Sequence, residues 1–212
     1  MMRIITGRAR GIKLETLEGD ATRPTSERAK EAIFSRLQFE IEGRRVLDLF
    51  AGSGQMGLEA VSRGASHAVL VDQSKDAIAV IRKNAERTRL AGDCTVVCSD
   101  FAEFLRQRKG KEPFDLIFID PPYAMTACRA AVEAILEARL LKPYGILVLE
   151  SAEADPLGVN TPLAARFEVL KSARYGKAFV NILTPLHKEE ESIFDPLDPT
   201  QVDLSGIVNA KK

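Results

Sequence analysis

The stretch FDLIFIDPPY, residues 114–123, passes from a run of apolar residues into an acid, two prolines and a tyrosine. The apolar run predicts a buried strand. That strand must end at Pro121 and Pro122, because proline lacks an N–H donor and has a fixed φ. Asp120 and the two prolines thus form a rigid corner at the end of the strand. A turn without function is the simplest alternative, since Asp followed by Pro is common in turns.

The chemistry that suits such a corner is transfer to an exocyclic amine or amide nitrogen, whose lone pair is delocalised. The Asp120 carboxylate and the Pro121 carbonyl can accept both hydrogens of an NH₂ group and so favour a tetrahedral, nucleophilic nitrogen. The prolines hold these acceptors in place, and the ring of Tyr123 offers a face on which a planar group can stack. Asp120, Pro121, Pro122 and Tyr123 are therefore the predicted catalytic residues.

A second candidate site is the loop DLFAGSGQMG, residues 48–57, in which Gly52, Gly54 and Gly57 have the spacing of a dinucleotide-binding loop. Asp72 follows at the end of the next predicted strand, where such loops place the acid that binds a ribose. Taken alone, this motif predicts an NAD(P)-dependent oxidoreductase.

Asp48 argues against a dinucleotide. A carboxylate four residues before Gly52 would repel a pyrophosphate, which needs N–H groups and positive potential. S-adenosyl-L-methionine (SAM) has no phosphate and carries an ammonium and a sulfonium cation, which a carboxylate attracts. Asp72 could then accept hydrogen bonds from the ribose, and Asp100 from the adenine amino group, with Phe101 packing on the ring. Asp72 and Asp100 could instead merely cap the helices that follow them.

From Arg45 onward, predicted strands and helices alternate, and the strands are nearly continuous apolar runs. This alternation predicts an α/β fold with a doubly wound, mostly parallel seven-stranded sheet, closed by an antiparallel C-terminal hairpin strand that turns at Gly176. The predicted strands are 45–50, 67–72, 94–100, 114–120, 145–150, 167–176 and 178–185, and the predicted helices between them are 56–64, 74–89 (capped by Ser74), 102–108 and 127–140.

A small hairpin-and-helix extension is predicted before this sheet. RIITG and GIKLETL, residues 3–7 and 11–17, favour short strands, and a helix with Thr25 or Ser26 as N-cap follows. The predicted domains are an N-terminal extension at 1–40, a methyltransferase domain at 41–186 and an acidic tail at 187–212.

Composition and charge are those of an ordinary globular protein. Apolar residues make up 45% of the 212 residues, and the formal net charge is zero. The charge is unevenly spread, because residues 1–30 carry seven Lys and Arg against four acids, whereas residues 187–212 carry three Lys against six acids. A basic head is the surface a polyanion would meet, although a solvated charged surface explains it equally well.

Location and metal content are predicted mainly from what the sequence lacks. No apolar run is long enough to span a membrane, and the first residues do not look like a signal peptide. Three cysteines, Cys94, Cys98 and Cys128, lack the spacing of a metal site, so we expect reduced thiols, no metal and a cytoplasmic location.

These residues resemble class I SAM-dependent methyltransferases that act on amino groups, and more closely the bacterial RsmD family, which methylates N2 of a guanine in small-subunit (16S) ribosomal RNA. The resemblance covers roughly residues 3–184. It is carried by GRARGIKL, RPTSERAKEAIFSRL, VLDLFAGSGQMGLEAVSRGA and FDLIFIDPPY, in the order of the family. RYGKAFVNIL is a looser match, and the acidic tail is an extension.

The resemblance implies SAM as cofactor and ribosomal RNA or the small ribosomal subunit as partner. It implies cofactor binding by Asp48, Phe50, Gly52, Gly54, Asp72, Gln73, Asp100 and Phe101. It makes Arg8, Arg10, Lys13, Arg23 and Arg28 candidate phosphate contacts. Other acceptors remain open, because adenine N6 in DNA and a glutamine amide in a protein are planar nitrogens too. A non-catalytic RNA-binding module with a decayed site is a further alternative.

Overall fold

The computed structural model describes residues 2–17, 24–121 and 125–186, and for residues 24–26, 125 and 126 it describes the backbone alone. Arg23, Pro122, Tyr123 and the tail at 187–212 lie outside these residues. What the sequence predicts of them therefore stays a prediction.

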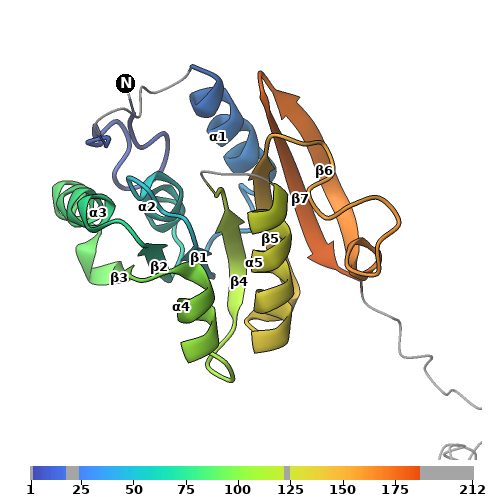
Figure 1. Ribbon diagram of the computed structural model, residues 1–212. Helices are drawn as coiled ribbons and strands as arrows, with labels where there is room; N and C mark the ends of the chain where they lie inside the picture. The colour runs from blue at the N-terminus through green and yellow to red at the C-terminus, as the bar shows by residue number, and fades with distance from the viewer. Residues whose placement is uncertain (1, 18–23, 122–124, 187–212) are drawn as a thin grey trace, which may run out of the picture.

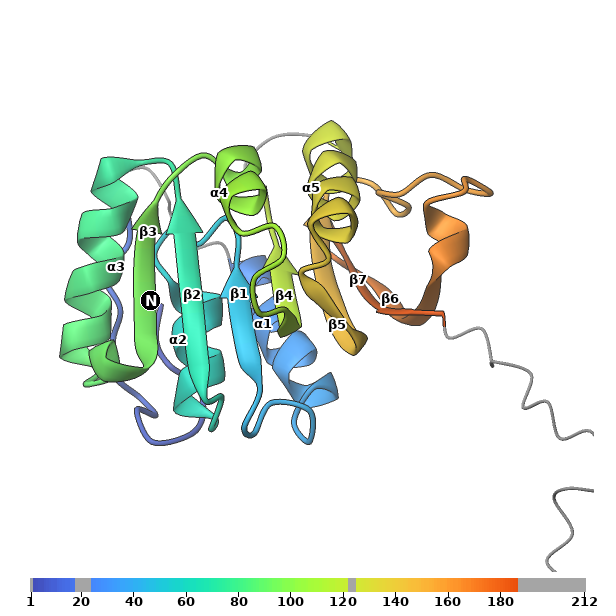
Figure 2. The same ribbon diagram turned by 90° about the horizontal axis from the view of Figure 1, so that it is seen from below.

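The described residues form a seven-stranded sheet. Its strands are β1 (Arg45–Asp48), β2 (His67–Asp72), β3 (Cys94–Cys98), β4 (Phe114–Ile119), β5 (Leu141–Ser151), β6 (Phe167–Tyr175) and β7 (Ala178–Pro185). They lie side by side in the order β3-β2-β1-β4-β5-β7-β6 (Figure 2). The strands from β3 to β5 pair in parallel, and β7 is antiparallel to β5 and β6. The predicted doubly wound sheet with one antiparallel strand is confirmed, including the hairpin turn at Gly176.

Five α-helices of the described residues cover both faces of this sheet. They are α1 (Pro24–Arg36), α2 (Gln55–Ser62), α3 (Lys75–Arg87), α4 (Phe101–Gln107) and α5 (Met125–Ala138). Helices α1, α2 and α3 lie on one face of the sheet, and α4 and α5 lie on the other (Figure 1). The buried side chains of each group belong to one core cluster. Short 3₁₀ helices at Ala91–Asp93 and Ala164–Arg166 precede β3 and β6.

β4 shows why a central strand is apolar along its whole length. Phe118 faces α1, where its ring centroid lies 5.7 Å from that of Phe34. Ile117 and Ile119 face α5 on the other side of the sheet. All these side chains are buried, so the strand contributes to both cores, as covered parallel strands do.

Two predicted helix caps have different outcomes. α1 begins at Pro24, so the prediction of Thr25 or Ser26 as its N-cap is wrong. Proline is favoured at the first helical position, because its missing N–H is not needed there and its φ suits the helix. Ser74 caps α3 as predicted, since its hydroxyl accepts the N–H of Ala77 at 3.3 Å.

The N-terminal segment corrects a second prediction. Residues 2–14 fold back on themselves, but a single antiparallel bridge, Arg3 with Lys13, replaces the two predicted strands. The ladder stops because the next backbone donors turn to α2: the N–H of Thr6 binds Glu59, and the N–H of Arg8 binds the Ser62 carbonyl at 2.9 Å. The segment is thus a hairpin fastened to a helix.

Glu59 is the residue that fastens this segment, and no local pattern predicted that role. Its carboxylate is fully buried and accepts the N–H of Ile5 at 2.7 Å, the N–H of Thr6 at 3.0 Å and Nε of Arg63 at 2.7 Å. Lys30 of α1 lies 3.6 Å away and donates to the Arg3 carbonyl. Burial lowers the pKa of Lys30, and the Glu59 charge opposes that shift. One carboxylate therefore joins α1, α2 and the N-terminal segment.

Replacing Glu59 by Ala is expected to lower the free energy of unfolding by about 3 kcal/mol or more, because it leaves buried N–H groups and the Lys30 ammonium without their partner. Urea denaturation measures this change. Glu31→Ala, which removes an exposed acid from α1, is the matched control. Equal denaturation midpoints for the two variants would contradict the anchoring role.

Candidate active site

Three carboxylates from distant parts of the sequence meet at the carboxyl edge of the sheet. Asp48 ends β1, Asp72 ends β2, and Asp120 follows the last residue of β4. These strands are neighbours, and Asp48 is opposite Leu70 of β2 and Phe118 of β4 in the register. Open parallel sheets bind their ligands at this edge. The structure therefore brings the predicted glycine-loop acids and the predicted catalytic acid into one region.

The glycine loop between β1 and α2 allows this close arrangement. Gly54 has φ +79°, and a Cβ there would lie 3.1 Å from Cδ2 of Leu70. At Gly57 a Cβ would lie 2.9 Å from the same atom. Larger residues would push α2 away from the sheet, so the predicted motif serves the packing of helix on strand as well as access for a ligand.

Asp48 lies beneath this loop and is 3% exposed. Its carboxylate accepts the N–H of Gly57 at 2.9 Å. Burial raises the pKa of Asp48 to about 7, and the nearby charge of Asp72 adds to this rise, although the Gly57 hydrogen bond opposes it. A cation bound above the loop would stabilise the ionised form.

Asp72 has structural contacts through both oxygens. One accepts the N–H of Gly52 at 2.9 Å, and the other accepts the N–H of Ser74 at 2.8 Å. The first contact fixes the glycine loop against β2, which the sequence did not reveal. The second contact holds Ser74, the N-cap residue of α3, next to the end of β2. Each carboxylate oxygen has a second lone pair for a ligand hydroxyl.

Asp100 begins α4 and caps it. Its Oδ1 accepts the N–H of Ala102 at 2.9 Å and of Glu103 at 3.3 Å, so the capping alternative is what the structure shows. Both bonds use one oxygen, and the other can face a ligand. The rings of Phe50 and Phe101 lie beside this acid, with centroids 5.2 Å apart, and offer an apolar surface for a planar base. Gln73 is exposed on the same edge, after β2.

The predicted catalytic corner is described at two of its four residues. Asp120 is exposed and Pro121 is half-buried, at the end of β4. Cys128 of α5 is buried nearby, and burial together with the charge of Asp120 raises the pKa of its thiol to about 12. A thiol with so high a pKa is not a nucleophile at neutral pH, so Cys128 is not a candidate for nucleophilic chemistry.

Comparison with protein families identifies the group to which this site belongs. A model of the family described as Conserved hypothetical protein 95 matches residues 2–184. The chain belongs to this family, the RsmD family.

Similar proteins agree with this membership. The chain is 35% identical over 150 residues to ribosomal RNA small subunit methyltransferase D of Escherichia coli strain K12, covering 71% of this chain and 74% of that protein. It is 33% identical over 157 residues to the protein of the same name from Haemophilus influenzae, covering 74% and 81%. The solved structure of yhhF from Escherichia coli superposes with a TM-score of 0.74 at 30% identity, covering 87% and 97%. The predicted class I methyltransferase fold is confirmed.

The structure describes four of the five basic residues that the family resemblance singled out, all but Arg23. Arg8 lies at the amino edge of the sheet, where it pairs with Asp93 just before β3. Arg10 and Lys13 are exposed on the N-terminal segment, and Arg28 is exposed on α1. Their role toward a nucleic acid stays a prediction.

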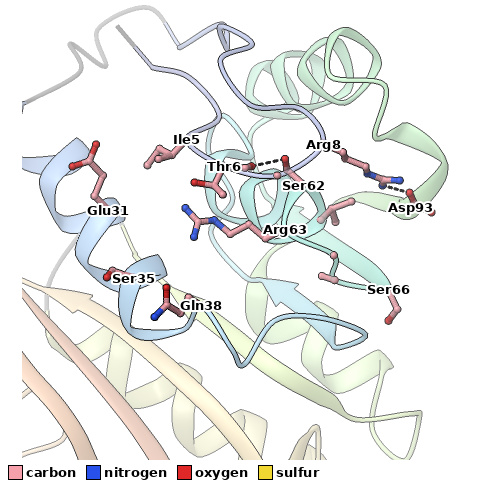
Figure 3. A pocket seen from close by; sticks show the side chains of 14 residues that line it. Ile5, Thr6, Arg8, Glu31, Ser35, Gln38, Ser62, Arg63, Ser66 and Asp93 are labelled. Atoms are coloured by element: carbon pink, nitrogen blue, oxygen red, sulfur yellow. Dashed lines mark hydrogen bonds and ion pairs between the residues drawn. The ribbon is translucent and has the colours of Figure 1, made fainter.

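A cavity of about 880 Å³ lies between α1, the N-terminal segment and the turn from α2 to β2 (Figure 3). Asp48, Asp72 and Asp120 are not among its lining residues. Its lining residues Gly64 to Ser66 precede β2, so it opens at the amino edge of the sheet. The Arg63 guanidinium reaches into it and also lies 4.8 Å from the ring centroid of Phe34. The sequence did not predict this cavity.

The part of the chain that the structure describes contains neither a cluster of metal ligands nor a helix that could span a membrane. No group of three or more His, Cys, Asp or Glu residues there could hold a metal ion, and no helix there is long and apolar enough to cross a membrane.

Proposed function

We propose that this protein transfers a methyl group from SAM to the exocyclic N2 of a guanine in small-subunit (16S) ribosomal RNA. The observation that carries the proposal is the meeting of Asp48, Asp72 and Asp120 at one edge of a methyltransferase fold, around a glycine loop. Relatives named ribosomal RNA small subunit methyltransferase D, which share about a third of their aligned residues with this chain, support the choice of RNA.

The cofactor half of the site consists of residues around the glycine loop. SAM supplies an electrophilic methyl group on a sulfonium. We assign the buried Asp48 charge to attract the cations of SAM, Asp72 to accept from its ribose hydroxyls, and Oδ2 of Asp100 to accept from its adenine amino group. Phe50 and Phe101 would pack on the adenine ring. A pyrophosphate would face the same buried acid unfavourably, which disfavours the oxidoreductase alternative.

The acceptor half is the corner after β4. The Asp120 carboxylate and the Pro121 carbonyl accept the two N2 hydrogens, so the nitrogen lone pair points at the methyl carbon. With SAM bound, its C–S bond would break as the new N–C bond forms, and Asp120 or water would take the proton that the nitrogen loses. An RNA base must leave its stack to reach this corner, and Tyr123 is the proposed stacking surface.

Incubation with labelled SAM and small ribosomal subunits that lack the modification, followed by nucleoside analysis, tests the proposal. We expect label in N2-methylguanosine, and no incorporation into subunits that already carry it. N6-methyladenosine or a methylated glutamine as the product would instead favour the alternative acceptors. No transfer to any of these substrates would refute the proposed function.

Asp72→Ala is expected to weaken SAM binding at least tenfold, because it removes the proposed ribose acceptor and frees the N–H of Gly52. Isothermal titration calorimetry measures the affinity. Asp76→Ala, which removes an exposed acid from the first turn of α3, is the control and should bind SAM normally. Equal affinities for the two variants would refute the ribose role.

A further inference from the structure

Glu150 lies beside the catalytic corner, although the mechanism above does not use it. It is at the carboxyl end of β5, and Leu149 is in register with Ile119 of β4, so Glu150 and Asp120 are the next pair along the two strands. Neighbouring strands lie about 4.8 Å apart. Side chains alternate along a strand, and Val148 of β5 faces α1, so the Glu150 side chain lies on that face of the sheet, next to the point where β4 ends before Asp120.

The backbone around Glu150 is held on two sides. Its carbonyl accepts the Cys128 thiol of α5 at 3.6 Å, and the residue pairs with Val180 of β7. The loop after β5 is fastened too, because Asn181 donates to the Ala154 carbonyl at 3.2 Å. The Glu150 side chain therefore starts from a fixed position at the edge of the site, as a specificity residue requires.

The Glu150 carboxyl group is half-buried, and burial raises its pKa. The ion pairs of the Lys and Arg side chains that the structure describes go to other acids. A half-buried carboxylate is unfavourable unless a donor compensates for the water it loses, and carboxyl groups with a raised pKa are typical of ligand sites. A donor supplied by a ligand would offset this cost.

Guanine brings a suitable donor. Its Watson–Crick edge carries N1–H next to the N2 amino group, so a base whose N2 hydrogens face Asp120 and Pro121 presents N1–H to the side of the corner. We propose that Glu150 is a specificity-determining residue that accepts the N1–H of the target guanine. Adenine has a lone pair at N1, which the carboxylate repels. This inference rests on the proposed function and explains the choice of guanine within it.

The test uses 2-aminopurine, which has the same amino group at C2 but a lone pair in place of N1–H. Small subunits are reconstituted with guanine or 2-aminopurine at the position that wild-type protein labels, and kcat/KM is measured for both. Wild type should favour guanine about 100-fold or more, since sites built around a hydrogen bond reject analogues that lack it. Glu150→Gln should reduce this preference at least tenfold, because its amide can donate to the N1 lone pair.

Glu153→Gln is the matched control. It removes an exposed acid from the loop after β5 and should keep the wild-type preference. Glu150→Ala is a second variant, which removes the acceptor altogether and should also reduce the preference for guanine over 2-aminopurine. Wild-type affinity for SAM would show that both Glu150 variants are folded. An unchanged ratio of guanine to 2-aminopurine in both Glu150 variants would overturn the inference, even if their overall rates fell. Wild type without activity on guanine would instead refute the proposed function.

Discussion

Asp120→Ala should lower kcat for methyl transfer by about a thousandfold, while the affinity for SAM changes less than twofold. In the proposed mechanism the carboxylate is the acceptor that orients the attacking nitrogen, and removing one preorganised hydrogen-bonding group typically costs this much. The proposed cofactor residues lie at the ends of β1 and β2, in the glycine loop and at the start of α4, so truncation after β4 leaves them in place. Single-turnover transfer from labelled SAM measures the rate, and calorimetry measures the affinity.

Asp115→Ala provides a comparison within the same strand. Asp115 lies near the other end of β4 and contacts Lys142 and the N–H of Arg45. We expect this variant to lose some stability and to keep its rate at temperatures where it is folded. An Asp120→Ala protein that transfers methyl groups at near the wild-type rate would eliminate the proposed mechanism.

Asp48→Asn should have opposite effects on binding and on stability. The neutral amide still accepts the Gly57 N–H but offers no charge to a cation, so SAM affinity should fall 10- to 100-fold, as expected for the loss of a charged hydrogen-bond partner. Calorimetry at pH 8, where the wild-type carboxylate is ionised, measures this loss. Equal affinity in the variant would contradict the role of Asp48.

The stability effect follows from the raised pKa. Asp48 has a pKa of about 7 in the folded protein against 3.8 for a free side chain, so its favourable contribution is present below pH 3.8 and is lost as the pH rises to about 7. Ionisation of the buried Asp48 carboxyl lowers the free energy of unfolding of the wild type by about 4 kcal/mol. Burying the neutral amide of the variant costs about 1–3 kcal/mol, so the net gain in stability is smaller than about 4 kcal/mol. Without SAM, Asp48→Asn should therefore unfold at a higher temperature than wild type at pH 8, with a smaller difference at pH 4. A lower melting temperature at pH 8 would contradict this assignment.

The sheet was predictable because its signal is local. Strands β1, β2 and β4 are short apolar runs that end in, or are followed by, an aspartate, and the helix after β2 has its own start signal at Ser74. The carboxyl ends of parallel strands share one edge, so the convergence of Asp48, Asp72 and Asp120 followed from the order of the elements alone.

The contacts that were missed depend on pairs of residues far apart in the sequence. Nothing around Glu59 indicates that it will receive the N–H groups of Ile5 and Thr6. Likewise, the second role of Asp72 appears only when β2 lies beside the glycine loop. The prediction of two N-terminal strands was wrong for the same reason, because α2 accepts hydrogen bonds from the backbone N–H groups that would have extended them. Local pattern gives the elements, whereas side chain to backbone bonds between elements require the assembled fold.

The buried contacts of Glu59 also make the N-terminal segment depend on residues much later in the chain. Its bond to Ile5 closes a loop of 54 residues, which is entropically costly until α2 is present. The N-terminal segment is therefore expected to reach its final place only once α2 has formed and packed, because its anchor lies on that helix.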